Sequence, residues 1–181
     1  TPRYYRKIKI TLSAMDIYKI ESSQWWNGSE ASEAIGLTAE LSEAMRSSSD
    51  DYTQIRAKLM PYVSPTCLIC NGVFVAYGRN VIGCSDGFMN TNASVLDHAE
   101  VRIGDSLFMA PSAVITTIGH AVDHDKRAAG LVQAKPVTIG NNVWLCANVT
   151  VCPGVTIGDN VVIGAGVTVR SDVPSNTVLL Q

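Results

Sequence analysis

The sequence predicts a mainly β protein built as a parallel β-helix, with a short helical segment before it and one protruding loop. The first observation is a six-residue repeat: from Ile139 the chain reads IGNNVW, LCANVT, VCPGVT, IGDNVV, IGAGVT and VRSDVP, ending at Pro174. The second is a long interruption of this repeat after Ile115. The third is a polar start, up to about residue 64, whose apolar residues have helical spacing.

Each position of the repeat has its own residue preference. Position one is large and apolar, position two is usually small, and position five is mostly valine. The same frame occurs upstream as IGDSLF and MAPSAV over residues 103–114, and more loosely as MNTNAS from Met89. Each hexad supplies one short strand and one turn, so three hexads form a coil of about 18 residues with position-one side chains inside. We expect Gly and Asn at the corners, because they adopt tight or left-handed turns at low cost.

The chain divides into two parts at about residue 64. Residues 1–64 are predicted to form a helical N-terminal segment packed on the same domain, and residues 65–181 the β-helix. The stretch 29–45 has helical periodicity, and the stretch 47–60 opens with Ser and Asp capping candidates and stops before Pro61. The apolar residues expected near one face of the first helix are Ile35, Leu37, Leu41 and Met45.

Composition and charge favour a folded, soluble protein. The chain is 46% hydrophobic and 17% charged, which is enough for a buried core. A net charge of -2, with one small basic cluster over residues 3–9, argues against a nucleic-acid partner. No stretch approaches the roughly 18 consecutive apolar residues that cross a membrane, and lysines break the run KIKITLSAM as a signal-peptide core. We therefore expect a cytoplasmic protein without a membrane partner.

The five cysteines point in the same direction, because an odd number does not fit a disulfide scaffold. Cys67 and Cys70 form one C-x-x-C pair, which is typical of half a zinc site or of a redox pair. No second pair follows at suitable spacing, so packing is the favoured interpretation. Cys146 and Cys152 fall inside the repeat, where a small apolar side chain is needed.

The interruption is the main candidate for function. Ile139 follows Ile115 by a whole number of hexads, yet residues 118–133 carry none of the pattern. This loop excursion must leave the triangular stack of coils, which we call the prism, and return in register. A loop of that length in a compact fold is usually functional. It begins with the charged stretch TIGHAVDHDKR, which places His120 where the chain departs from the coils. We expect residues 123–127, His124 included, to form its solvated rim.

Three stretches carry a resemblance to a known family: EVRIGDSLFMAPSAVITTIGHAVDHDKR, then KPVTIGNNVW, then PGVTIGDNVVIGAGVTVRSDVPSNTV. With them the sequence resembles the galactoside and maltose O-acetyltransferases and the related nodulation acetyltransferases, over about residues 65–178. The GH-x-V-x-H motif followed by KPVTIGNNVW is specific, whereas a hexapeptide repeat alone also occurs in non-catalytic proteins. The resemblance implies a left-handed β-helix that assembles as a homotrimer with active sites between subunits.

The same resemblance implies an enzyme that moves an acetyl group from acetyl-coenzyme A, its co-substrate, to a hydroxyl of a sugar or related small molecule, without a metal. His120 matches the general base, and imidazole suits this role because the attacking alcohol must lose its proton near neutral pH. Asn90 and Asp97 match positions that hold the acceptor. We count Asn90 with His120 as a catalytic residue. The backbone N–H of Ala147 matches the group that stabilises the developing oxyanion.

The donor site is expected along the coils. By resemblance, the pantetheine arm lies near Ala147 and Ala165, with Arg170 and Ser171 toward the nucleotide end. Trp144 is either a donor-site residue or a subunit-interface residue. Because the sequence ends in SNTVLLQ, we expect the coil surface alone to form this site, with Arg170 as its nearby cation and weak attraction for phosphate.

The acceptor site is expected to differ from that of the galactoside type. His98 stands where that type has a second aspartate, and Ala76 replaces a polar residue just before Tyr77; both are predicted to contact the acceptor. Two alternatives stay open. One is an enzyme that keeps His120 as acid or base for another small-molecule substrate without coenzyme A. The other is a metal site of the γ-carbonic-anhydrase kind, formed by His98, His120 and His124.

Overall fold

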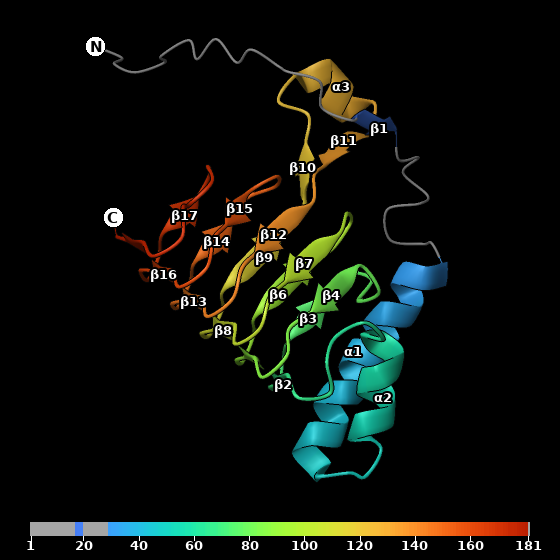
Figure 1. The fold of residues 1–181 in the computed structure, drawn as a ribbon. Coiled ribbons are helices and arrows are strands. Elements are labelled where there is room, and N and C mark those ends of the chain that lie inside the picture. Colours follow the sequence, from blue (N-terminus) through green and yellow to red (C-terminus); the bar gives the residue numbers. More distant parts are fainter. Residues whose placement is uncertain (1–16, 20–28, 181) are drawn as a thin grey trace, which may run out of the picture.

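The computed structural model describes residues 17–19 and 29–180 of the chain (Figure 1). Short parallel strands wind into a left-handed β-helix, two helices lie at its N-terminal end, and one loop protrudes from its side. The predicted fold class is therefore confirmed. The basic cluster at residues 3–9 lies outside the described residues. Within the described ranges, every helix is too short or too polar to cross a membrane.

The strands of the β-helix form three parallel sheets, and each of the first four coils contributes a strand to all three. The six-stranded sheet contains β2 (Leu68–Ile69), β5 (Phe88–Met89), β8 (Phe108–Met109), β13 (Trp144–Leu145), β16 (Val162–Ile163) and β18 (Val178–Leu179). The five-stranded sheet contains β3 (Phe74–Val75), β6 (Ser94–Leu96), β9 (Val114–Thr116), β14 (Thr150–Val151) and β17 (Thr168–Val169). The four-stranded sheet contains β4 (Val81–Gly83), β7 (Val101–Ile103), β12 (Val137–Ile139) and β15 (Thr156–Ile157).

The core is a stack of position-one side chains. Met89 pairs with Met109 in the parallel register, and Leu145 pairs with Ile163; all four are fully buried. The position-five valines, such as Val149, also point inward and are buried. Because burial of apolar area is the main stabilising contribution to folding, the hexad period itself selects the coil.

The corners of the prism carry the turn residues that the repeat predicts. Asn142, Asn148 and Asn160 all have positive φ values, of 53°, 58° and 56°, in the region that asparagine and glycine tolerate best. The Asn142 side chain donates to the Asn160 Oδ1 at 3.0 Å, and the Asn160 side chain donates to Asn176 at 3.1 Å. The expectation that asparagine marks the corners is confirmed.

Helix α1 (Ser29–Ser47) and helix α2 (Tyr52–Leu59) lie beside the first coils (Figure 1). The buried face of α1 differs from the predicted one, because Ile35 is 38% exposed and Met45 is only partly buried. The residues that are buried on α1 are Ala34, Leu37, Leu41 and Ala44. Their spacing of three and four residues is helical, and the small alanines let the helix approach its neighbours closely.

The excursion has secondary structure of its own. It contains β10 (Ile118–His120), helix α3 (His124–Ala128) and β11 (Leu131–Ala134), and the chain rejoins the coil where the Lys135 N–H donates to the Thr117 carbonyl at 2.7 Å. Strands β10 and β11 pair antiparallel, and β1 (Ile17–Lys19) adds to the free side of β11 (Figure 1). The sequence did not predict that an N-terminal segment pairs with this loop.

Candidate active site

The six-residue repeat is interrupted at one corner of the prism in three successive coils. Position-one residues are normally six apart, as across residues 151–157. They are eight apart across residues 75–83 and 95–103, and 24 apart across residues 115–139. The expected coil of 18 residues is therefore wrong for the first coils, which repeat every 20 residues. The extra residues all follow strands of the five-stranded sheet, so we call this corner its trailing edge and the corner before those strands its leading edge.

Asp97 holds the trailing edge together from inside. Its side chain is fully buried, and its carboxylate accepts hydrogen bonds from the backbone N–H groups of Tyr77, at 2.9 Å, and Asn80, at 3.2 Å. The Asn80 side chain also donates to the Asp97 carbonyl at 2.6 Å. Burial raises the pKa of Asp97 to about 6, against the backbone hydrogen bonds that lower it. Within this chain its carboxylate faces the turns and not solvent, so a contact with an acceptor does not follow from its position.

His98, the next residue, takes the outward position instead. Its imidazole is half-buried and meets the Tyr77 ring edge to face, with centroids 5.2 Å apart and an interplanar angle of 88°. Burial lowers the pKa of His98, so the ring is neutral at pH 7. Ala76 is buried one residue before Tyr77 and exposes almost no side chain. The open groups at this corner are therefore Tyr77 and His98.

Thr117 occupies the equivalent place one coil further on. It is fully buried, its hydroxyl donates to the Leu96 carbonyl at 2.8 Å, and the same oxygen accepts from the Ala99 N–H at 2.9 Å. Tyr77, Asp97 and Thr117 thus stand in register at spacings of 20 residues. Sequence reasoning missed Tyr77, Asn80 and Thr117 as parts of this corner, although the eight-residue spacing of position one was a signal that could have found them.

His120 ends β10, the strand that carries the chain away from the trailing edge, and its side chain is exposed. It pairs in register with Val132 of β11, so the antiparallel ladder of the excursion determines its position. Ala121, the residue after it, is buried, and the Arg127 side chain donates to its carbonyl at 3.0 Å. A short ladder and one side-chain bridge therefore hold the backbone on both sides of His120.

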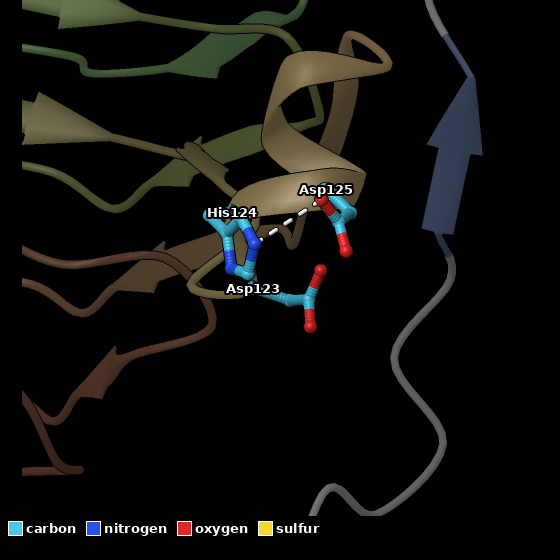
Figure 2. Close-up of side chains that lie close together, drawn as sticks. All are labelled: Asp123, His124 and Asp125. Atoms are coloured by element: carbon cyan, nitrogen blue, oxygen red, sulfur yellow. Dashed lines mark ion pairs between the residues drawn. The ribbon is translucent and has the colours of Figure 1, made fainter.

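His124 begins α3, and its side chain lies beside that of Asp125 (Figure 2). Its Nε2 is 3.2 Å from the Asp125 carboxylate, and both side chains are more than 80% exposed. The Asp123 carboxylate caps α3 by accepting from the Lys126 N–H at 3.0 Å. Among the described residues, these three are the group spaced to hold a metal ion, and neither His98 nor His120 belongs to it. The geometry does not assemble the three-histidine site.

Asn90 stands at the leading edge, directly after β5. Its backbone N–H donates to the Met109 carbonyl at 2.9 Å, and its side-chain oxygen accepts from the Thr91 N–H at 2.7 Å. Ala147 and Ala165 occupy the same edge one coil apart, since the Gly166 N–H donates to the Ala147 carbonyl at 2.9 Å. Within the described part of the chain, the N–H groups of Ala147 and Ala165 donate no hydrogen bond. This edge presents unused backbone donors.

The remaining donor-site candidates lie before and after the five-stranded sheet along the coils. Trp144 points outward from β13 and is 51% exposed, beside Phe108, which is 49% exposed. Arg170 and Ser171 follow β17 at the trailing edge, and both are exposed. A hollow runs across this last coil, lined by residues 166–171 together with Leu179 and Leu180. It reaches from the corner next to Ala165 to Arg170.

The predicted catalytic residues do not meet within one chain. The trailing edge gathers Ala76, Asp97 and His98, with His120 on the strand that leaves it, whereas Asn90 lies at the leading edge. The strands of the five-stranded sheet separate the two edges in every coil. An acceptor held by Asn90 of one chain therefore lies at the leading edge of the five-stranded sheet, whereas His120 of that chain belongs to the trailing edge.

Comparison with known proteins agrees with these observations. Residues 136–171 match the family model described as bacterial transferase hexapeptide (six repeats). The galactoside O-acetyltransferase of Escherichia coli K12 is 43% identical over 106 residues, which are 59% of this chain and 52% of that protein. The chain thus spans about half the length of that curated relative.

Two solved structures extend the likeness to most of the fold. A maltose O-acetyltransferase from Clostridium difficile 630 is 33% identical, with a TM-score of 0.80, and the match covers 85% of this chain and 84% of that one. A galactoside acetyltransferase in complex with coenzyme A is 31% identical, also with a TM-score of 0.80, and the match covers 90% of this chain and 80% of that one.

Proposed function

The chain belongs to the hexapeptide-repeat O-acetyltransferases of the galactoside and maltose type, and from this premise we propose that it transfers an acetyl group from acetyl-coenzyme A to a hydroxyl of a small, sugar-like acceptor. The family resemblance stated from its motifs is confirmed. The observation that carries the proposal is the position of His120. This residue ends β10, the strand that leaves the trailing edge, where three coils carry extra residues.

His120 acts as the general base of the reaction. The acceptor oxygen attacks the thioester carbonyl while the imidazole takes the hydroxyl proton, which contributes about 10²- to 10⁴-fold to the rate. The carbonyl oxygen gains negative charge, and the unused N–H of Ala147 is the donor that stabilises it. The tetrahedral intermediate then expels the coenzyme A sulfur, which receives the proton from the imidazolium. No covalent enzyme intermediate is needed.

The donor lies along the coils between the leading edge and the hollow of the last coil. The unpaired N–H groups of Ala147 and Ala165 suit the amides of a pantetheine arm, which carry carbonyl acceptors. Arg170 and Ser171 line the hollow at the nucleotide end. The chemistry of these residues therefore fits coenzyme A, although it supplies a single arginine for the phosphates.

His98 and Tyr77 form the acceptor side of the trailing edge. A neutral imidazole and a phenol can each donate and accept hydrogen bonds to sugar hydroxyls, and their rings offer apolar surface. Because the Asp97 carboxylate is occupied by two backbone N–H groups, its part is to shape the turn that presents His98. Ala76 is buried beside Tyr77 and contributes no polar group.

The active form is a homotrimer with sites between subunits. In a cyclic trimer the interface is heterologous, so two different patches of the chain meet, and the proposed arrangement sets the trailing edge of one subunit against the leading edge of the next. This brings His120 of one chain to Asn90 of its neighbour, which a single chain does not achieve. The six-stranded sheet adds outward apolar side chains next to the leading edge, among them Phe108 and Trp144. Light scattering should give three times the chain mass; a monodisperse monomer at micromolar concentration would remove the shared site.

The reaction is tested with acetyl-coenzyme A and a panel of sugars and polyols, with release of the free coenzyme A thiol as the signal. Calorimetry with acetyl-coenzyme A should show binding that coenzyme A competes. If millimolar acetyl-coenzyme A does not bind, while His120 still supports activity on another substrate, the acetyl-transfer proposal is wrong. The outcome would then favour the enzyme that works without coenzyme A.

A further inference from the structure

Two thiols and a guanidinium meet inside the N-terminal end of the β-helix. Cys67 lies just before β2 and Cys84 just after β4, and their Sγ atoms are 3.0 Å apart. Both side chains are buried, with exposures of 2% and 0%. The C-x-x-C motif joins Cys67 to Cys70 in the sequence, whereas the structure places Cys67 against Cys84.

Arg56 of α2 reaches into the same place. Its side chain is 6% exposed and donates to the backbone carbonyls of Ser64 and Cys67, the latter at 3.4 Å. Its Nε has no hydrogen-bond partner, and within the described residues no carboxylate forms an ion pair with it. A buried cation without an anion is costly, so this position favours a neighbour that can become negative.

Cys67 is that neighbour. The hydrogen bond between the two sulfurs lowers the pKa of Cys67, burial raises it, and the Arg56 charge lowers it further. The same contact raises the pKa of Cys84. A thiolate therefore forms more readily at Cys67 than at Cys84. A lowered pKa at one sulfur and a second sulfur in contact with it are two of the features that a nucleophilic and a resolving cysteine share.

The backbone leaves room for the two sulfurs. A Cβ at Gly87 would collide with the Cys84 Sγ and lie 3.5 Å from the Cys67 Sγ, so glycine is the residue that accommodates the pair. Cys84 itself has a φ of 59°, a left-handed value that turns its side chain into the prism. The glycine and the left-handed backbone at Cys84 thus make this corner fit the two thiols in contact.

We propose that Cys67 and Cys84 form a reversible intramolecular disulfide when the protein meets a small peroxide. The Cys67 thiolate attacks one oxygen of hydrogen peroxide, the O–O bond breaks, and a sulfenic acid and a hydroxide ion form. The Cys84 sulfur attacks the sulfenic sulfur and releases the hydroxide, which leaves as water with the Cys84 proton. In total two thiols lose two electrons and two protons, and one peroxide becomes two water molecules.

The disulfide would join the turn before the first coil to the corner of the next. It closes a loop between residues 67 and 84, and Arg56 connects the same point to α2. Loops of this length give a stabilisation that raises the melting temperature of a chain of this size by about 6–12 °C. Oxidation would therefore lock the N-terminal end of the β-helix without touching His120 or Asn90.

Peptide mapping tests the bond directly. The variant Cys70→Ser is treated with limiting hydrogen peroxide, alkylated, and digested with trypsin, which cleaves after Arg79 and separates residue 67 from residue 84. We expect one cross-linked peptide pair that reducing agent separates. Recovery of both residues as alkylated thiols, with Cys146 or Cys152 oxidised in their place, would overturn the proposal.

Thermal unfolding gives an independent measure. Peroxide should raise the melting temperature of the wild-type chain and of Cys70→Ser by similar amounts, and reducing agent should reverse both shifts. Cys84→Ser should lose the shift while its reduced form still melts cooperatively. If Cys84→Ser does not fold, Cys67→Ser serves as the second variant. A shift that survives removal of either cysteine would also contradict the proposal.

Discussion

At the leading edge of the five-stranded sheet every coil turns in the same way, whereas at the trailing edge three successive coils carry extra residues. The leading-edge turns each contain one residue with a φ between 58° and 77°: Gly72, Asn92, Ser112, Asn148 and Gly166. The trailing edge instead holds a buried carboxylate, an edge-to-face ring pair and a loop with its own small sheet.

The difference teaches how a repeat supplies both parts of a site. A regular corner repeats the same backbone at every coil, so it offers N–H groups such as those of Ala147 and Ala165 at a fixed spacing. An irregular corner breaks that regularity and can direct large polar side chains outward, as it does for His98 and His120. Backbone groups suit a donor with a long uniform arm, and side chains suit the proton transfer.

The largest effect is expected at the irregular corner. His120→Ala should leave the fold intact and lower the rate of acetyl transfer by about 10²- to 10⁴-fold, because it removes the general base. His124→Ala is the matched control, since this histidine is exposed at the start of α3 and pairs with Asp125. Thiol release by the two variants measures the difference. Equal losses would mean that the two histidines act together and that the comparison of the corners is wrong.

Mixing two inactive variants tests whether the two edges meet between chains. His120→Ala and Asn90→Ala should each be impaired, but their co-expression should restore activity. In a cyclic trimer each site takes His120 from one chain and Asn90 from the next, so at equal amounts one half times one half, or about a quarter, of the sites are complete. Steady-state rates of the purified mixture check this figure. If no activity returns, both residues serve the same chain.

The buried carboxylate predicts a pH-dependent stability. Burial raises the folded-state pKa of Asp97 to about 6, above its ordinary value of 3.8, so folding favours the protonated form. This stabilisation is present below the ordinary value and is lost as the pH rises through about 6. Between pH 4 and pH 7 the free energy of unfolding of the wild type should fall relative to that of Asp97→Asn by about 2 kcal/mol.

Denaturant unfolding over this pH range measures that difference. Asp159→Asn is the control, because this carboxylate also accepts from a backbone N–H, that of Asn141 at 2.7 Å, but is exposed. It should keep the pH dependence of the wild type. A curve for Asp97→Asn that runs parallel to the wild type would show that the trailing edge does not depend on the protonation of this residue.

The smallest effect is expected from the exposed cation of the last coil. Arg170→Ala should raise the Kd for acetyl-coenzyme A by no more than about fivefold, because one exposed ion pair contributes about 1 kcal/mol or less, and added salt should reduce even that. Arg102→Ala is the control, since Arg102 points outward from the four-stranded sheet and pairs with Glu100. A tenfold or larger loss from Arg170→Ala would mean that charge and not backbone contact dominates donor binding.

Much of the fold could be predicted because the repeat is a local signal. Position-one residues such as Ile139 and Leu145 have to be apolar wherever they occur, so their period of six is visible without any structure. The period was hidden in the first coils, where Gly83 takes position one and pairs with Ile103. A glycine at a position that is otherwise aliphatic conceals the frame and the extra residues with it.

The site could be predicted only in part. The position of His120 at the start of an excursion followed from the interruption, and its catalytic role stays a prediction. The sequence could not show that Asp97 is buried while His98 is open at the surface, because neighbouring residues in a turn share the same sequence context. Their burial alone, complete for the carboxylate and partial for the imidazole, separates a residue that holds the corner from one that is open at its surface.

The sequence by itself determined the β-helix, its corner residues, the excursion and the family, because each depends on residues close together in the chain. Only the tertiary structure decided which residues are neighbours across coils. It placed Cys67 against Cys84 and put Asn90 and His120 on opposite edges of one sheet. The physical reason is that coil register depends on the number of residues in every turn, so two extra residues in a corner change which groups meet while leaving the apolar stack intact.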